Sequence, residues 1–411
     1  MYFLPHLNYD RPRSYISSMA TARFLHAADL HLGSPLKSLG TRVSTEIHDL
    51  AKKQVNTVFQ NLVNVAKSEQ VDFVVLAGDI YDTADRDPGA QIRVNLGLRE
   101  LSDAGIKVFL VHGNHDPLTP DYLSGRSLPQ GVFVFPAGEV TSHIVTMSNG
   151  AEVTVAGVSY KTTAEENNLA RLFQSVSGRT IVGVLHTNVG GNNQHGNYAP
   201  CSSADLQTSP VNYWALGHIH DRQVHETPKG YWAYPGNLQG RSTKATECGA
   251  KGVLIVDVHE DGSLEAPRFV ACDAIRFQRL TIDLTDVSNN SDVLEIAIEK
   301  LKEAVADSED RSLMVRLEFT GATEIYDQFV NDFEKTSSSI MGMSQDIMGN
   351  GAVVKICHTC RRAIDLTIER TRKSILSFVL NELDSKTQEE IPDELRSAVE
   401  LLLVDALGWA Q

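Results

Sequence analysis

The sequence contains no apolar run as long as the roughly 18 to 20 residues that a membrane-spanning helix needs. Its N-terminus also lacks the order of charged, apolar and small residues that marks a secretory signal. These absences argue against an integral membrane protein, and we expect a cytoplasmic protein that does not bind membranes.

Cysteine is scarce, with five residues in a chain of 411. An odd number scattered along a long chain fits reduced thiols better than a disulfide framework. Cys357 and Cys360 form a CxxC motif, but no second pair follows at the spacing of a zinc site. We therefore interpret the pair as buried or surface thiols, in preference to a metal or redox role.

Basic residues are also in short supply, with 37 Lys and Arg against 52 Asp and Glu and a net charge of -15. The whole protein therefore has no basic field to attract nucleic acid, and any polyanion must be bound locally. What the chain does have is 42% hydrophobic and 22% charged residues. This balance excludes a disordered chain or a small disulfide scaffold and predicts a globular protein of two or three domains.

The pattern along the chain divides it into four parts. Residues 1–20 show no sustained period, which predicts a disordered extension. Residues 21–275 carry the strands and helices of the main domain, and residues 276–360 indicate a small α+β capping module. Residues 361–411 look helical, with a break near Pro392. Their apolar face either packs on the protein's own body or docks a partner, and periodicity leaves both interpretations open.

The main domain alternates apolar strands with helical patterns. The runs "ARFLHAAD", "DFVVLAGD" and "KVFLVHGN" are expected strands, separated by helices over 44–68 and 90–104. After residue 131 come further short strands and one helix near 163–175. We predict an α/β (α+β) fold in which two packed mixed β-sheets are flanked by helices. Functional loops are then expected at the carboxyl ends of the strands.

The capping module contains expected strands at "FQRLTIDL" and "SLMVRLEF" and a helix near 291–306. It holds 8 basic and 15 acidic residues, a net charge of -7. We therefore expect this module to be a poor phosphate binder by itself.

Five segments of the main domain share one design, in which an apolar strand ends at oxygen or imidazole side chains beside small residues. They are "HAADLH", "LAGDIYD", "VHGNHD", "VLHTN" and "ALGHIH". The candidate ligands in them are Asp29, His31, Asp79, Asp82, Asn114, His115, Asp116, His186, His218 and His220. Carboxylate, amide and imidazole together suit a divalent ion of intermediate hardness such as manganese, iron or zinc.

The spacing within two segments supports a shared site. Asp29 and His31 lie two residues apart, as do His218 and His220, so on an extended chain each pair projects to one side. Asp79 is the expected bridge, because one carboxylate can bind both cations of a binuclear hydrolytic site. Five such segments in order argue against unrelated surface polar residues.

Glycines stand beside the ligands. Gly78, Gly113 and Gly217 each precede a ligand directly or by one residue. A side chain at these positions would obstruct a tight turn or the approach of a substrate.

The ordered set D-x-H, G-D-x-x-D, G-N-H-D, H and G-H-x-H resembles the calcineurin-like metallophosphoesterase superfamily over about residues 22–275. The resemblance implies a sandwich of two sheets that holds two divalent ions, which activate a hydroxide to attack phosphorus. It implies that one ion is bound by Asp29, His31, Asp79 and His220, and the other by Asp79, Asn114, His186 and His218. It further implies that His115 protonates the leaving oxygen and that Asp82 orients His115.

Motifs outside the metal set narrow the resemblance. "YPGNLQGR" at 234–241, "GVLIVDV" soon after it, and "HTNVGG" from His186 are similar to SbcD-type DNA-repair exonucleases, in particular the YhaO-like branch. The resemblance implies hydrolysis of DNA phosphodiester bonds with manganese, with iron, zinc or magnesium as alternatives. It also implies a coiled-coil ATPase subunit of the SMC type as partner, and pairing of two copies into a homodimer.

Two other functions remain as alternatives to a DNA exonuclease or endonuclease. The same site would serve a phosphatase or a small-molecule or cyclic-nucleotide phosphodiesterase, but such an enzyme needs no long C-terminal extension. A scaffold without catalysis would have to keep clustered carboxylates and histidines without their ions, which costs free energy.

Four other residues near the motifs are candidates for different roles. Arg241 is the first candidate for substrate contact, with a solvated surface arginine as the alternative. His26 and His112 are expected to be strand or packing residues. His195 is a further candidate for lining the cleft.

Overall fold

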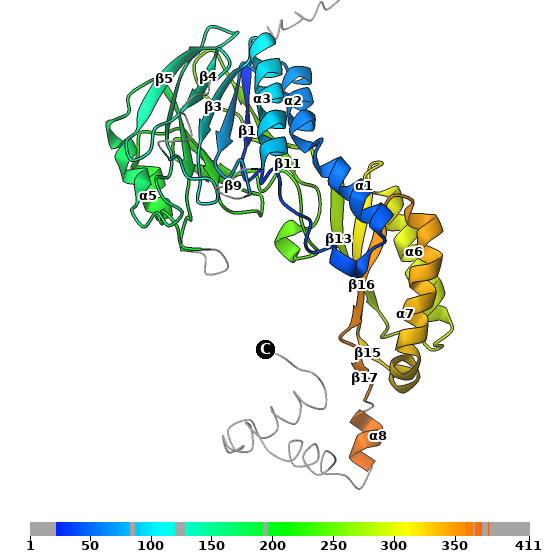
Figure 1. Cartoon of the computed structure of the whole chain (residues 1–411). Helices are drawn as coiled ribbons and strands as arrows, with labels where there is room; N and C mark the ends of the chain where they lie inside the picture. Colours follow the sequence, from blue (N-terminus) through cyan, green and yellow to red (C-terminus); the bar gives the residue numbers. More distant parts are fainter. Residues whose placement is uncertain are drawn as a thin grey trace, which may run out of the picture. The chain divides into compact units, whose positions relative to one another are not determined.

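The computed structural model describes residues 22–82, 87–119, 128–191, 196–364, 366–371 and 377 (Figure 1). The chain forms two compact units, each assembled from separate stretches of sequence. The first contains Met1–His31, Leu62–Gly236 and Val253–Val270, and the second contains Leu32–Asn61, Asn237–Gly252 and Ala271–Gln411. The expected N-terminal extension and almost all of the expected C-terminal helices lie outside the described residues, apart from α8 (Leu366–Thr371).

The first unit contains two six-stranded sheets. One has the order β12-β11-β1-β2-β3-β4, with strands Arg268–Ala271, Gly252–Val258, Ala22–Ala27, Phe73–Ala77, Lys107–Val111 and Val132–Val134. Strands β1 to β4 run parallel, and β11 is antiparallel to β1. Every residue of β2 is buried, as expected for a parallel strand covered on both faces.

The second sheet has the order β5-β6-β7-β8-β10-β9. Its strands are Thr141–Thr146, Glu152–Val158, Thr180–His186, Tyr213–Gly217, Gly230–Tyr234 and Gln223–Thr227. The four inner strands run parallel, and the two edge strands β5 and β9 are antiparallel to their neighbours. Both large sheets are therefore mixed, as predicted.

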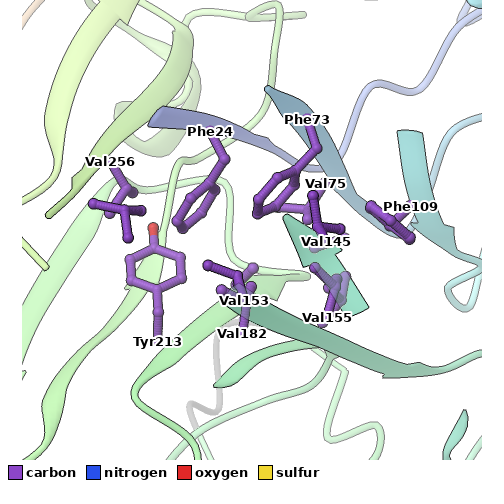
Figure 2. Packing of buried hydrophobic residues seen from close by; sticks show 14 of the residues in the cluster. Phe24, Phe73, Val75, Phe109, Val145, Val153, Val155, Val182, Tyr213 and Val256 are labelled. Atoms are coloured by element: carbon purple, nitrogen blue, oxygen red, sulfur yellow. The ribbon is translucent and has the colours of Figure 1, made fainter. Parts of the chain in front are cut away.

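The two sheets pack through apolar side chains (Figure 2). Phe24 and Phe73 stack with ring centroids 4.8 Å apart, and Tyr213 of the second sheet meets Phe24 edge-on at 5.2 Å. His26 is fully buried in β1, and its Nδ1 lies 2.9 Å from the Tyr213 hydroxyl. This confirms His26 as a packing residue, and burial lowers its pKa to about 3.

Helices account for the main differences from the predicted elements. The single helix expected over 44–68 is two helices, α1 (Thr45–Val55) and α2 (Val58–Ser68), and α1 belongs to the second unit. The helix expected near 163–175 is a 3₁₀ helix at Leu169–Ser175, whereas α3 (Pro88–Asp103) agrees with prediction. Shorter elements are the 3₁₀ helices Gly40–Arg42 and Ala245–Glu247 and helix α5 (Ser203–Thr208).

The second unit is built on a parallel sheet in the order β13-β14-β16, with strands Ile275–Asp283, Ser312–Thr320 and Ala352–His358. Helices α6 (Asp292–Ala306) and α7 (Tyr326–Met348) cover one face through a shared apolar cluster. A two-stranded sheet pairs β15 (Ala322–Thr323) with β17 (Arg361–Arg362). This part of the second unit therefore combines a parallel sheet with two helices, of which α7 was not predicted.

The other face of this three-stranded sheet is only partly covered. Residues of α1 and of the segment before it pack on Ile275, Phe277, Met314 and Val354. All five cysteines of the chain are free thiols, and Cys360 is buried among the residues between the sheet and its two helices.

Candidate metal centre

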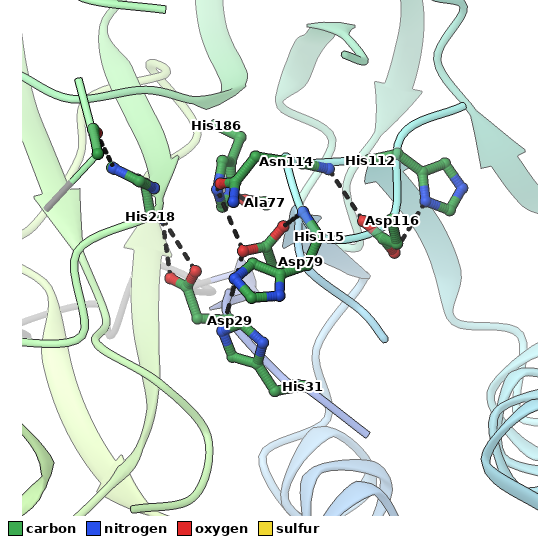
Figure 3. A network of polar contacts seen from close by, with 12 residues as sticks. Asp29, His31, Ala77, Asp79, His112, Asn114, His115, Asp116, His186 and His218 are labelled. Carbon is green, nitrogen blue, oxygen red and sulfur yellow. Dashed lines mark hydrogen bonds and ion pairs between the residues drawn. The ribbon is translucent and has the colours of Figure 1, made fainter. Parts of the chain in front are cut away.

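The predicted ligands meet where strands β1, β2, β3, β7 and β8 of the first unit end (Figure 3). Three overlapping groups have ligand atoms that all lie within 4.8 Å of one another. These groups are Asp29 with His31 and His220, Asp29 with Asp79 and His186, and His31 with Asp79 and His115. Side chains from distant parts of the sequence therefore converge on one place.

His186 presents a nitrogen lone pair to this centre. Its Nδ1 lies 2.9 Å from the Ala77 carbonyl oxygen, so Nδ1–H donates to that oxygen. Burial lowers the pKa of His186 to about 4, so the ring carries only this one proton at neutral pH. Nε2 then faces two oxygens, Asn114 Oδ1 at 3.0 Å and Asp79 Oδ2 at 3.5 Å. Three electron-rich atoms this close fit a shared cation, and the donor set suits a divalent metal.

His31 has the same two-sided arrangement. Its Nδ1 lies 3.3 Å from Asp82 Oδ1, while its Nε2 lies 3.1 Å from His220 Nε2 and 3.8 Å from Asp79 Oδ2. A carboxylate beside Nδ1 favours the tautomer whose Nε2 is free to bind metal. The Asp82 side chain therefore faces a predicted ligand.

The two buried aspartates are held by main-chain donors. His218 N–H donates to the Asp29 carboxylate at 2.9 and 3.1 Å, and His115 N–H donates to Asp79 Oδ1 at 2.9 Å. Burial, together with the nearby charge of Asp116, raises the pKa of Asp79 above its usual value. Buried carboxylates are costly to keep ionised unless a cation neutralises them.

Several ligands have strained backbone. Of the eight described residues other than glycine with positive φ, four are predicted ligands: Asp29 at 51°, His31 at 44°, Asp79 at 51° and His218 at 105°. Each such conformation costs about 1 to 3 kcal/mol. The expectation that Asp29 and His31, or His218 and His220, converge because they alternate on extended chain is therefore wrong. Tight turns at the strand ends bring them together.

Glycines leave the space that the ligands occupy. A Cβ on Gly78 would lie 2.4 Å from His186 Nδ1, and a Cβ on Gly113 would lie 2.3 Å from Asp79 Oδ1. A Cβ on Gly217 would meet the Ala77 carbonyl oxygen first and His186 Nδ1 next. The sequence predicted that a side chain would be excluded at these glycines, and the groups obstructed are predicted ligands at all three and also main chain at Gly217.

Asp116 joins two of the ligand loops, a role that the sequence did not reveal. This fully buried carboxylate accepts hydrogen bonds from the backbone N–H groups of Gly113 at 3.0 Å, Ile80 at 3.1 Å and Tyr81 at 3.3 Å. It also lies 3.0 Å from His112 Nδ1. The sequence placed Asp116 among the candidate ligands, but it belongs to none of the three ligand groups, and the pattern gave no indication of these backbone partners.

His115 stands at the partly exposed side of the centre. Its Nδ1 lies 2.7 Å from the carbonyl oxygen of Asp82, so the contact between these two predicted catalytic residues runs through the main chain. Its ring meets that of His31 edge-on, with centroids 4.7 Å apart. The orientation leaves Nε2 as the second protonation site of the ring.

The remaining candidates lie in different surroundings. His218 places its ring beside His186, with centroids 5.2 Å apart, and its Nε2 lies 2.7 Å from the Gly196 carbonyl oxygen. Arg241 belongs to the second unit, where its backbone N–H donates to Glu247 at 2.8 Å. Its role in substrate contact stays a prediction, and His195 lies outside the described residues.

Comparison with known families agrees with this geometry. Residues 22–222 match the calcineurin-like phosphoesterase family, so the chain carries a metallophosphoesterase domain, a hydrolase class with a binuclear metal site. Residues 277–358 match the middle domain of the metallophosphoesterase YhaO. The chain thus carries a calcineurin-like phosphoesterase domain and a YhaO-type middle domain, and it is homologous to the YhaO, SbcD and Mre11 proteins.

Three relatives show how similar the chain is in sequence to known proteins. The chain is 33% identical over 268 residues to the uncharacterized metallophosphoesterase YhaO of Bacillus subtilis, which covers 65% of this chain and 64% of that protein. It is 24% identical over 296 residues to the DNA double-strand break repair protein Mre11 of Sulfurisphaera tokodaii, covering 69% and 70%. It is 28% identical over 272 residues to the SbcD component of the SbcCD nuclease of Bacillus subtilis, covering 57% and 66%. The matches thus span just under two thirds of both Bacillus proteins.

Proposed function

We propose that this chain is a metal-dependent DNA phosphodiesterase, an exonuclease or endonuclease of DNA repair. The observation that carries the proposal is the convergence of carboxylates and imidazoles from five strand ends into groups with ligand atoms within 4.8 Å. Asp29, His31, Asp79 and His220 would hold one ion, and Asp79, Asn114, His186 and His218 the other. Manganese is the proposed metal.

The chain's own residues have distinct tasks in this proposal. Bound cations would lower the pKa of a water nucleophile and offset the charge that develops on phosphorus. The Ala77 carbonyl oxygen holds the His186 ring with Nε2 toward the centre, and the Asp82 carboxylate lies beside Nδ1 of His31, whose Nε2 also faces the centre. His115, fixed through Nδ1, would carry a proton on Nε2 to the leaving oxygen.

DNA as the substrate is supported by the relatives. SbcD is named as part of a nuclease and Mre11 as a DNA double-strand break repair protein. The YhaO-type middle domain distinguishes the chain from a phosphoesterase domain alone. A phosphatase acting on small molecules is the competing function for the same centre.

The proposed setting is a cytoplasmic complex with DNA, an SMC-like coiled-coil ATPase and a second copy of the chain. The name of the SbcCD relative supports a multi-subunit enzyme. In the part of the chain that the structure describes, no helix is both long and apolar enough to cross a membrane.

A substrate and metal comparison tests the proposal. Purified chain is assayed on duplex DNA, single-stranded DNA, bis(p-nitrophenyl) phosphate and p-nitrophenyl phosphate, each with Mn²⁺, Mg²⁺ or Zn²⁺. We expect hydrolysis of DNA and of the diester, greatest with Mn²⁺, and weak DNA turnover until the ATPase is added. Hydrolysis confined to the monoester would identify a phosphatase instead.

His115→Ala tests the assignment of the general acid. We expect loss of DNA turnover by about 10²- to 10⁴-fold, because an alkoxide leaves poorly without a proton. The diester bis(p-nitrophenyl) phosphate should be affected less, since p-nitrophenolate needs little protonation to leave. Calorimetric Mn²⁺ titration should show binding largely retained. Equal losses on both substrates, or intact DNA hydrolysis, would refute the assignment.

A further inference from the structure

The three-stranded sheet of the second unit has one face that changes character along its length. At one end of β13 and β14, Ile275, Phe277 and Met314 are buried under α1 and the segment before it. Further along the same face, Arg279, Thr281 and Lys355 are exposed, while Arg316 on the middle strand is half-buried. The helices α6 and α7 pack on the opposite face. Among the described residues, the outer strands of the far half are therefore open to solvent, and its middle strand is partly so.

Three basic residues lie side by side across the open half. The parallel register pairs Arg279 of β13 with Arg316 of β14, and Arg316 with Lys355 of β16. We call these three residues the basic row. Because neighbouring strands are about 4.8 Å apart, the row places three cationic side chains within about 10 Å of sheet width.

A β-bulge brings Lys355 into the basic row. The register shifts between Val315 and Arg316, so that Val315 pairs with Val353 while Arg316 pairs with Lys355. Val353 packs among the residues under α6 and α7, and Val354 packs on the α1 side. Simple alternation would return Lys355 to the face covered by α6 and α7, but the bulge keeps it on the open face. Bulges recur where a side chain is redirected for a function.

The basic row carries unbalanced charge. Like charges on neighbouring strands repel each other, which makes such a row unfavourable by itself. Glu318 offsets part of this: its Oε2 lies 3.1 Å from Arg279 Nη2 and 3.3 Å from Arg316 Nη2. Lys355 forms no ion pair with the described residues. Asp283, the other acid on this face, lies at its far end and accepts hydrogen bonds from Thr285.

The net charge of the module, -7, does not reveal the basic row, because the acidic residues lie mostly elsewhere. Eight of its 15 acidic residues lie on α6 and α7, which cover the opposite face. The sheet therefore separates an acidic side from a side with three clustered cations. The expectation that the module is a poor phosphate binder by itself rested on its net charge alone and stays a prediction, which the proposal below opposes.

We propose that the basic row binds the phosphodiester backbone of duplex DNA. This inference rests on the proposed function, and it assigns the substrate contact to the YhaO-type middle domain. Arg side chains present several N–H donors, so Arg279 and Arg316 can contact Glu318 and a phosphate together. In a chain with a net charge of -15, contact with DNA requires such a local cluster.

Charge substitutions test the proposal by fluorescence anisotropy with a labelled DNA duplex, using full-length chain in EDTA across a range of salt. The double variant Arg279→Gln with Lys355→Gln should bind tens of fold more weakly at about 0.1 M salt, because each lost phosphate contact removes about 0.9 from the slope of log K against log salt. Glu318→Gln should bind DNA more tightly, since it frees the two arginines from their counter-charge.

The matched control changes the same charge on the opposite face of the same sheet. Lys300→Gln with Lys302→Gln removes two α6 lysines that pair with Glu303 and Glu299, and we expect DNA affinity within about twofold of wild type. Circular dichroism melting checks that each variant is folded. The single variant Lys355→Gln changes an exposed position, and it should lower the slope of log K against log salt by about 0.9.

Two outcomes would overturn the inference. One is a DNA affinity and a salt slope that do not change in the double variant. That result would be expected if the basic row binds an acidic protein partner and not DNA. The other is an equal loss in the α6 control. Hydrolysis of bis(p-nitrophenyl) phosphate with Mn²⁺ distinguishes failure of the basic-row proposal from failure of the proposed function. The rate of this hydrolysis should be the same in wild type and in all variants. If wild type does not hydrolyse the diester, the proposed enzymatic function is refuted.

Discussion

At the scale of single residues, the geometry of the centre depends on groups outside the three clusters of candidate ligand atoms. Asp116 is the clearest example, because one carboxylate accepts the backbone N–H of Gly113 and those of Ile80 and Tyr81. The loop that carries Asp79 and the loop that carries His115 are thereby held by a common acceptor. Ligand geometry is set by such partners as well as by the ligands.

Asp116→Asn should lower the affinity for Mn²⁺ by about 10- to 100-fold, because an amide N–H₂ would replace an acceptor with a donor facing backbone N–H groups. Calorimetric Mn²⁺ titration measures this, with the ratio of kcat to KM on bis(p-nitrophenyl) phosphate as a second readout. The control is Asp72→Asn at the surface, where the carboxylate also accepts a backbone N–H, from Ser148 at 2.8 Å. A wild-type Mn²⁺ affinity in Asp116→Asn would contradict the role.

His26 should make stability depend on pH. Burial lowers its pKa from 6.5 to about 3, so between these values the unfolded chain binds a proton that the folded chain does not. Its contribution is present above about pH 6.5 and is lost as the pH falls toward 3. From about pH 7.5 to pH 5, the free energy of unfolding should fall by about 2 kcal/mol more in wild type than in His26→Gln. Urea unfolding measures both, with exposed His225→Gln as the control; equal losses would exclude this linkage.

The ligand types were readable from the sequence, but their geometry was not. Aspartates and histidines indicated the centre because five apolar runs in order each end at ligand-type side chains beside small residues. Their left-handed backbone, as at Asp29 and His218, depends on hydrogen bonds between strands far apart in the chain, which no local pattern contains.

At the scale of elements, strand ends are packed so closely that some positions accept only glycine. A Cβ on Gly217 would lie 1.9 Å from the Ala77 carbonyl oxygen and 2.8 Å from His186 Nδ1. The end of β8 thus abuts the end of β2, where the ligand-bearing turns begin. The distance between the two sheets at this edge is set by a residue without a side chain.

Gly217→Ala should lower the free energy of unfolding by about 3 kcal/mol and weaken Mn²⁺ binding, because backbone must move to admit the methyl group. Urea unfolding gives the first quantity and calorimetry the second. Gly342→Ala in α7 is the matched control, since no atom lies within 4 Å of the added carbon. There alanine should raise stability by up to about 1 kcal/mol. A neutral result at Gly217 would disprove the packing argument.

Strands were predicted better than helices, for a physical reason. Buried strands such as β2 are continuous apolar runs, whereas α7 mixes exposed polar residues with few fully buried ones such as Phe329 and Ile340. The pattern over 44–68 fits one helix, and the break at Asn56 and Thr57 follows from α1 packing in the other unit. Local periodicity indicates that one face of a helix is buried. It does not indicate which of the two units that face packs against.

At the scale of the whole molecule, removal of the C-terminal residues 365–411 should separate association from chemistry. A chain that ends at residue 364 retains the described metal centre, so it should hydrolyse bis(p-nitrophenyl) phosphate at the wild-type rate. We expect it to lose co-purification with a co-expressed SMC-type ATPase, because the apolar residues near "LLLV" at 401–404 are removed.

Two charge substitutions in the full-length chain control for the truncation. Leu401→Asp with Leu402→Asp should also abolish co-purification and leave diester hydrolysis unchanged. Association that survives both changes would assign these residues to internal packing instead.

The interleaved assembly of the two units has a consequence for how this protein can be dissected and how it can have diversified. The backbone passes from one body to the other after His31, Asn61, Gly236, Gly252 and Val270. Neither unit is encoded by one continuous segment of the gene. A single segment exchanged between proteins therefore cannot carry either unit intact. New specificities in this lineage would have to arise by substitution and loop growth, with catalytic and accessory parts inherited together.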